Sequence, residues 1–135
     1  MILKFIRTHF LKFMVFSTVG VCAFVIDWGF FNLFYSITEI FIFSLSLGWI
    51  ISMFFNFTVN RNITFSARGF SIKKQAFRWL IVYFIAFLAR MILGKSILFF
   101  IGENPLNANI AFFAGLLVSI PISFLGSLFW AFKKN

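Results

Sequence analysis

Residues 40–57 read IFIFSLSLGWIISMFFNF, and this stretch contains no lysine, arginine, aspartate or glutamate. A helix needs roughly 20 mostly apolar residues to cross the hydrocarbon core of a bilayer. Polar residues follow Phe57 and end the run. The stretch therefore predicts a helix that crosses a membrane.

Three further apolar runs lie on either side of it, at residues 13–34, 79–101 and 109–132. The first run contains Asp27, and the third contains Arg90 and Lys95. Asn104 and Pro105 mark a turn between the third and fourth runs. The pattern predicts an all-α integral membrane protein, with four transmembrane helices in a single domain that covers residues 1–135.

The composition excludes soluble classes of protein. Of the 135 residues, 62% are hydrophobic, only 11% are charged, and 25 are phenylalanine. A soluble domain is about half apolar and a quarter charged, and one of this size cannot hide so many rings from water. Four crossings leave no room for a separate catalytic domain.

Several kinds of chemistry lack the residues that they need. Cys22 is the only cysteine and His9 the only histidine, so an intrachain disulfide, a Cys/His zinc site and a Cys-His catalytic pair are excluded. The phosphate-binding motif G-x-x-x-x-G-K-[ST] is also missing, so this chain alone does not use ATP. We expect neither enzyme activity nor a cofactor.

The cations indicate the orientation in the membrane. They lie before the first run, between the second and third runs, and at the carboxyl end: Lys4, Arg7, Lys12, Arg61, Arg68, Lys73, Lys74, Arg78, Lys133 and Lys134. The other two connections hold Glu39 and Glu103 instead. The positive-inside rule then places both termini in the cytoplasm. Topology and anionic lipids account for the net charge of +9 without a nucleic acid partner.

The second and fourth runs indicate an internal repeat with a shift of 67 residues. The matched positions are Gly48 with Gly115, Ser52 with Ser119, Asn56 with Ser123, Asn60 with Ser127, Phe57 with Phe124, and Phe65 with Phe132. A spacing of four puts the small and polar members on one helix face. The first and third runs match more weakly, chiefly at Lys12-Phe13 and Arg78-Trp79. We expect two tandem two-helix repeats with the same orientation.

Asp27, Arg90 and Lys95 are candidate binding residues, because ionisable groups inside a membrane are costly and mark functional paths. Asp27 and Lys95 have similar predicted depths, which favours a pair between them. One acid cannot neutralise two cations, so the set carries one surplus positive charge, which suits a monoanionic guest. The alternative is that Asp27 pairs with Arg90 structurally, while Lys95 extends to the outer interface.

The segment 56–65, NFTVNRNITF, supplies the other candidates. Asn56 and Asn60 share one helix face at the cytoplasmic end of the second run, where amides can bind hydroxyl-rich groups. Arg61 lies at the level of the lipid head groups and can bind a phosphate. The alternative is an ordinary polar cap with an arginine that fixes topology.

Three segments carry a family resemblance: N-F-x-x-N-R-x-x-T-F at residues 56–65, Lys12-Phe13 followed by Gly20 and Asp27, and Phe129-Trp130-Ala131-Phe132. Together they resemble the GtrA-like family of small four-span membrane proteins, over nearly the whole chain. Family members often repeat an asparagine and an arginine near the carboxyl end. This chain departs from that pattern with Ser123, Ser127 and Leu128.

The resemblance implies movement of polyprenyl-phosphate-linked sugars across the bacterial cytoplasmic membrane, for modification of cell-surface polysaccharides. Arg61 with Asn56 and Asn60 would receive the head group, and Arg90 and Lys95, balanced by Asp27, would hold the phosphate further out. One alternative is a non-transporting subunit that anchors a polyprenyl-phosphate glycosyltransferase, with the loop from Arg68 to Arg78 as its docking surface. A second is a small multidrug exporter, although those proteins typically use a glutamate in the first span. A homo-oligomer is also plausible, because four short helices enclose little volume.

Overall fold

The computed structural model describes residues 2–64, 66 and 71–133, of which 93% are helical. The helices in chain order are α1 (Ile2–Thr38), α2 (Phe41–Val59), η1 (Asn60–Thr64), α3 (Ile72–Ile101), α4 (Pro105–Gly126) and η2 (Ser127–Ala131). The two short elements are π-helices that continue α2 and α4 without a break. The described residues contain no strand, so the predicted all-α class is confirmed.

Four helical segments are long and apolar enough to cross a membrane, as predicted. They extend beyond the apolar runs: α1 begins at Ile2 and α3 at Ile72. The reason is that hydropathy marks only the part of a helix that matches the hydrocarbon, whereas backbone hydrogen bonding continues outside it.

Short polar residues begin the helices of the second half. The side chain of Asn104 accepts a hydrogen bond from the Asn107 backbone N–H at 2.9 Å, and Pro105 lies in the first turn of α4. Both features are favourable at a helix amino terminus. Gly102 ends α3 with a φ of 84°, a conformation that glycine adopts without strain.

Several serine side chains inside the helices are satisfied locally. The hydroxyls of Ser44, Ser46 and Ser96 each donate to the carbonyl oxygen four residues earlier, at 2.9, 2.7 and 2.7 Å. These bonds allow hydroxyl groups to lie within apolar segments without unpaired donors.

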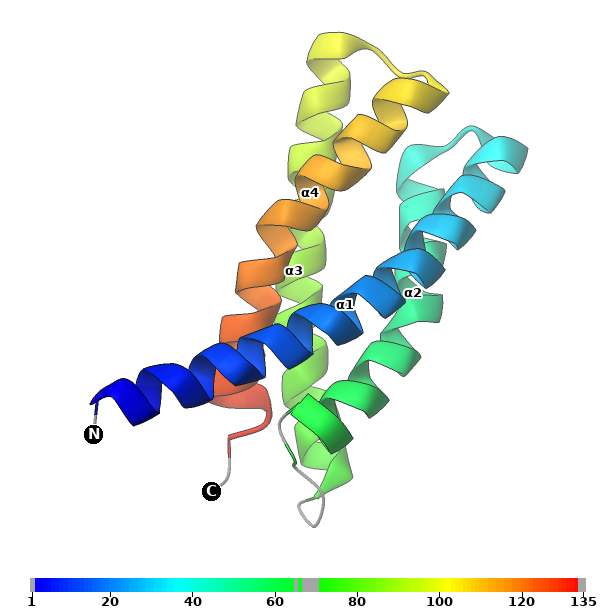
Figure 1. Ribbon diagram of the computed structural model, residues 1–135. Coiled ribbons are helices and arrows are strands. Elements are labelled where there is room, and N and C mark those ends of the chain that lie inside the picture. Colours follow the sequence, from blue (N-terminus) through cyan, green and yellow to red (C-terminus); the bar gives the residue numbers. More distant parts are fainter. Residues whose placement is uncertain (1, 65, 67–70, 134–135) are drawn as a thin grey trace.

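The helices form two hairpins, one of α1 with α2 and the other of α3 with α4 (Figure 1). Helices pack extensively within each hairpin and much less between hairpins. Both connecting turns lie at one end of the bundle, and the first and last described residues lie towards the other (Figure 1). The helix α1 crosses the α3/α4 hairpin obliquely, and its amino-terminal part projects sideways beyond it.

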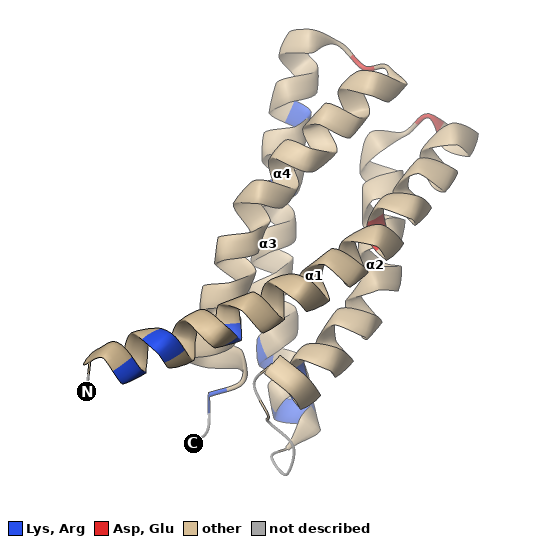
Figure 2. Cartoon of the chain, viewed as in Figure 1, with Lys and Arg blue, Asp and Glu red and all other residues tan. Residues whose placement is uncertain are grey.

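Charge separates along the bundle (Figure 2). Most lysines and arginines lie near the end with the termini, called the basic end below, whereas Glu39 and Glu103 lie in the two turns at the opposite end, called the turn end. This distribution has the form that the positive-inside rule describes, and the assignment of the basic end to the cytoplasm stays a prediction. Arg68, Lys134 and Phe65 lie outside the described residues.

The buried positions of α1 correspond to buried positions of α3 at a constant offset in residue number. The six buried positions of α1 are Phe16, Val19, Ala23, Asp27, Phe31 and Tyr35. A shift of 63 residues gives six buried positions of α3: Trp79, Val82, Ala86, Arg90, Gly94 and Leu98. The sequence matched Lys12-Phe13 with Arg78-Trp79, which is a shift of 66 residues. The buried positions are related by a shift of 63 instead.

The other two helices correspond with the predicted shift of 67. Buried Phe41, Ser44, Leu45 and Gly48 of α2 match buried Ala108, Ala111, Phe112 and Gly115 of α4. The same shift relates the π-helices Asn60–Thr64 and Ser127–Ala131. These correspondences support the two-repeat arrangement, which remains a prediction.

Two aromatic-rich clusters form the core. One includes Phe16, Trp79 and Phe132 and lies towards the basic end, and the other includes Phe31 and Phe112 and lies towards the turn end. Contacts between the rings fix this packing, such as the 4.7 Å separation of the Phe31 and Phe112 centroids.

Candidate functional site

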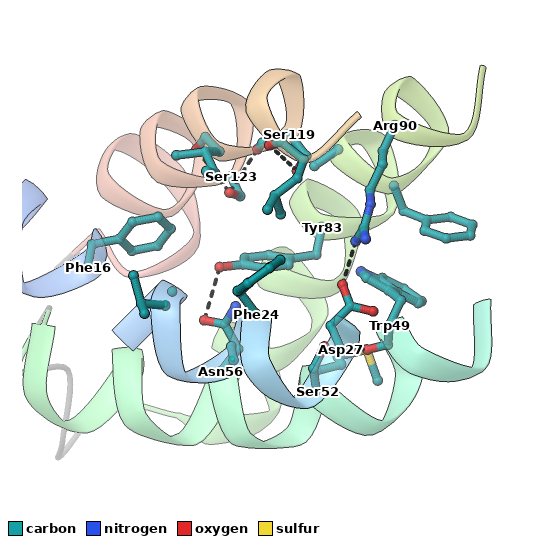
Figure 3. Close-up of a pocket in the computed structure, with 18 of the residues that line it drawn as sticks. Phe16, Phe24, Asp27, Trp49, Ser52, Asn56, Tyr83, Arg90, Ser119 and Ser123 are labelled. Carbon is teal, nitrogen blue, oxygen red and sulfur yellow. Dashed lines mark hydrogen bonds and ion pairs between the residues drawn. The ribbon is translucent and has the colours of Figure 1, made fainter. Parts of the chain in front are cut away.

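A cavity of about 330 Å³ lies between the two hairpins and is lined by residues from all four long helices. Rings from every helix form much of its wall, including Phe24, Trp49, Phe87 and Phe113. Its polar lining residues are Ser17, Asp27, Ser52, Asn56, Tyr83, Arg90, Ser119 and Ser123. Figure 3 shows Asp27 with Arg90 at one side and Asn56 with Tyr83 at the other. Such a cavity suits a partly polar guest.

Asp27 and Arg90 form an ion pair across the cavity. Arg90 Nη1 donates to Asp27 Oδ2 at 2.6 Å, and the two side chains are 4% and 6% exposed. The guanidinium also lies over the Phe112 ring, with Cζ 4.2 Å from its centroid. A buried charge is tolerated when it is paired in this way. The pair joins the two hairpins through α1 and α3.

Two glycines allow neighbouring helices to approach these charged residues. A Cβ on Gly48 would lie 2.7 Å from both the carbonyl oxygen and Oδ1 of Asp27. A Cβ on Gly115 would lie 2.6 Å from Cγ and 2.8 Å from the carbonyl oxygen of Arg90. Glycine at these positions therefore brings α2 against Asp27 and α4 against Arg90.

The ion pair leaves hydrogen-bonding capacity unused. Arg90 Nε and Nη2, together with Asp27 Oδ1, are buried and have no hydrogen-bond partner. Nε and Nη2 form one edge of the planar guanidinium, the geometry that binds two oxygens of a phosphate. Unsatisfied buried donors are costly, and they often mark a functional site.

Polar side chains continue from the cavity towards the basic end. The Tyr83 hydroxyl donates to Asn56 Oδ1 at 3.3 Å. Asn60 Nδ2 also donates to Asn56 Oδ1, and the Thr64 hydroxyl donates to Asn60 Oδ1 at 2.7 Å. Asn60 is fully buried. Asn56, Asn60 and Thr64 thus form a polar row along α2 and η1, as the spacing of the two asparagines predicts.

Arg61 lies beside this row and bridges two elements. Its Nε donates to Gln75 Oε1 of α3 at 2.7 Å, and its Nη1 donates to Asn62 Oδ1 at 3.2 Å. The side chain is partly buried. Arg61 therefore contributes to the contact between the hairpins at the basic end.

Lys95 requires a correction. The expected pair of Asp27 with Lys95 is wrong, because Asp27 pairs with Arg90. Lys95 lies 3.4 Å from Glu103, its side chain is 45% exposed, and it does not line the cavity. The expected surplus positive charge is therefore absent from the cavity, where Asp27 and Arg90 balance each other.

The sequence interpretation also missed Tyr83, Trp49 and Phe87, which line the cavity. Tyr83 lies seven residues before Arg90, so the two share one face of α3. That spacing was the available signal for Tyr83. The stacking of Trp49 on Phe87, with centroids 4.8 Å apart, has no comparable signal in a chain so rich in aromatic residues.

Four helices that are long and apolar enough to span a membrane define a multi-pass membrane protein, and a mostly apolar cavity with a few polar groups lies between its hairpins. A family model described as GtrA/DPMS, transmembrane domain, matches residues 15–132, nearly the whole chain. The chain belongs to this family, which confirms the resemblance found in its sequence. No curated protein and no solved structure gives a match to the chain.

Membership of the family indicates a part in the handling of polyprenyl-phosphate-linked sugars. Proteins of this family are generally non-catalytic membrane proteins. The question for this chain is then how the cavity and the buried ion pair contribute.

Proposed function

We propose that the protein moves a polyprenyl monophosphate sugar between the two leaflets of the membrane, with the head group in the cavity and the prenyl tail in lipid. The observation that carries this proposal is the buried Asp27–Arg90 pair beside the cavity. Its unused Arg90 donors fit a phosphodiester, whose passage through hydrocarbon is otherwise very costly.

The phosphate would bind the Nε/Nη2 edge of Arg90, while Arg90 Nη1 continues to donate its hydrogen bond to Asp27 Oδ2. Asp27 limits the strength of that binding, because the neutral pair offers donors without a full surplus charge. A transporter needs such a balance, since a guest that binds too tightly does not leave. The predicted role of Arg90 is kept in this proposal, whereas Lys95 has no part in it.

The sugar would contact the polar groups on the wall of the cavity. Its hydroxyls would find partners in Asn56, Tyr83 and Ser123, while the aromatic residues supply faces for the ring. The volume of about 330 Å³ is at the small end of the roughly 300–1,000 Å³ typical of ligand pockets, which favours a single sugar over an oligosaccharide.

Of the row from Asn56 to Thr64, Asn56 lines the cavity and would receive the head group from the basic end, while buried Asn60 holds the Asn56 amide in place. Arg61 stands beside that row and would meet the phosphate first. We assign the basic end to the cytoplasmic side of a bacterial inner membrane, on the charge distribution in Figure 2. A glycosyltransferase that consumes the lipid on the outer side would make the transfer run downhill.

The test is transfer of a labelled polyprenyl-phosphate sugar in vesicles that contain only this protein. We expect transfer by the wild type, loss of transfer in Arg90→Gln, and normal transfer in Lys74→Gln. The latter variant removes an exposed cation from the same helix and is the matched control. Absence of transfer by correctly inserted wild-type protein would contradict the proposal.

That outcome would favour the second candidate, a non-transporting subunit of a polyprenyl-phosphate glycosyltransferase. The observation behind it is the pair of exposed lysines, Lys73 and Lys74, at the first turn of α3. They extend from the basic end, where an acidic partner can reach them. We would then expect the protein to copurify with a transferase in a fixed ratio. The same preparation would also show whether several copies of this chain assemble with one another.

A further inference from the structure

The amino-terminal segment, residues 2–12, projects beyond the bundle (Figure 1). The helix α1 has 37 residues, so at 1.5 Å per residue it is about 55 Å long. The hydrocarbon core of a bilayer is only about 30 Å thick. The predicted crossing begins at residue 13, and the segment before it carries Lys4, Arg7 and Lys12.

This segment is not an ordinary polar extension. Its apolar residues are Ile2, Leu3, Phe5, Ile6, Phe10 and Leu11, and all six are exposed, Leu3 to 83%. No other part of the described chain covers them. Exposed apolar residues at this density require a cover, either a lipid surface or another protein.

The arrangement of the side chains around the helix favours lipid. At 100° per residue, Ile2, Leu3, Phe5, Ile6 and Phe10 fall within an arc of about 160°. The three cations fall within about 140° on the other side, with Leu11 between them. The segment contains no acidic residue. The only polar residue of the segment inside this arc is His9, between Phe5 and Ile2. A mostly apolar arc beside cations is the pattern of helices that lie at an anionic membrane interface.

The direction of α1 supports the same interpretation. Because α1 is oblique to the other hairpin, residues 2–12 lead sideways from the bundle instead of straight away from its end (Figure 1). Most other lysines and arginines gather at the same end (Figure 2). Among them are Arg78, near the start of α3, and Lys133, which follows η2. An anionic surface on that side would contact both the segment and these cations.

We propose that residues 2–12 form an amphipathic anchor that binds the anionic lipid surface at the basic end of the protein. Its apolar arc enters the head-group region, and Lys4, Arg7 and Lys12 contact lipid phosphates. The anchor holds α1 at an oblique angle to the membrane. This proposal does not depend on what the cavity carries.

The test uses Cys22→Ser protein in nanodiscs, with a fluorescent label at Phe10→Cys on the apolar arc. Thr8→Cys, at the centre of the cationic arc, is the matched control. The discs contain phosphatidylcholine, alone or with about one-third phosphatidylglycerol. Quenching by aqueous iodide measures exposure of each label to water.

We expect the Phe10 label to be protected from iodide relative to the Thr8 label, and more strongly in discs with phosphatidylglycerol. Replacing Lys4, Arg7 and Lys12 by serine should weaken the docking equilibrium about fivefold per cation. Equal quenching of the two labels in both lipid mixtures would overturn the proposal. So would protection of the Phe10 label that is the same with and without phosphatidylglycerol and that persists in the serine variants.

Discussion

At the scale of single residues, the Asp27–Arg90 pair has two separable roles. The 2.6 Å contact neutralises two charges on buried side chains. Removing one partner of such a pair leaves a buried charge and costs about 3–5 kcal/mol, whereas replacing both partners by neutral groups of similar size costs little. Stability therefore depends on charge balance, and phosphate binding depends on the guanidinium itself.

This separation can be measured. We expect Arg90→Gln to lower the free energy of unfolding by about 3 kcal/mol, because the Asp27 carboxylate loses its partner. The double variant Asp27→Asn/Arg90→Gln should recover most of that loss. Chemical denaturation of the purified protein in detergent checks both values. An Arg90→Gln variant as stable as the wild type would show that the pair is not buried as described.

The sequence singled out Asp27, Arg90 and Lys95 and left two partners open for the acid: it favoured Lys95, which is wrong, and gave Arg90 as the alternative, which the structure shows. Similar depth in the membrane favours Lys95 as the partner of Asp27, but depth does not say which way a side chain points around its helix. Rotation about the helix axis decides the matter: Lys95 follows Arg90 by five residues, about 140° around α3. Ala86, Arg90 and Gly94 share the buried face, so Lys95 points away from it.

At the scale of helices, the close approach of α2 to α1 and of α4 to α3 depends on Gly48 and Gly115. Backbone atoms of Asp27 and Arg90 occupy the space that a side chain would need. Backbone atoms move only with their helix, so even alanine would separate the helices of a hairpin.

We expect Gly48→Ala and Gly115→Ala each to destabilise the protein by about 1–3 kcal/mol. Gly29 in α1 is the control, because a Cβ there meets nothing within 4 Å. Gly29→Ala should be neutral or stabilising, as alanine favours a helix. Thermal unfolding of the three variants in one detergent compares them. Loss of stability in Gly29→Ala, with none in Gly48→Ala, would contradict this packing.

Elements were easier to predict than their ends. The apolar runs gave four helices in the right order, because burial in lipid demands long uninterrupted apolar segments. The extension of α1 to Ile2 and the π-helices Asn60–Thr64 and Ser127–Ala131 carry no hydropathy signal. They depend on backbone hydrogen bonding, which composition does not report.

At the scale of the whole molecule, two similar hairpins carry opposite charges at corresponding positions. A shift of 63 relates Asp27 of α1 to Arg90 of α3, and each faces a glycine of its own hairpin partner. The pair therefore lies where the two halves meet. The predicted arrangement of two repeats with the same orientation would bring an acid and a base face to face there. The ion pair joins the hairpins across the cavity.

The orientation of the molecule has a direct test. In a Cys22→Ser background, we expect Ser36→Cys at the turn end to react with a membrane-impermeant maleimide in intact cells. Ser66→Cys, at the basic end, should react only after permeabilisation. Both serines are exposed, so the labels reach them without disturbing the core. The reverse pattern of labelling would place the basic end outside and contradict the topology.

The most direct test of the central claim is sugar-lipid transfer by the double variant Asp27→Asn/Arg90→Gln in vesicles that contain no other protein. The account predicts a variant that is folded and inserted like the wild type, with transfer reduced by about tenfold or more, because the charge-assisted bond to the phosphate is lost. Transfer at the wild-type rate by this variant would contradict the account and separate the ion pair from the function of the protein.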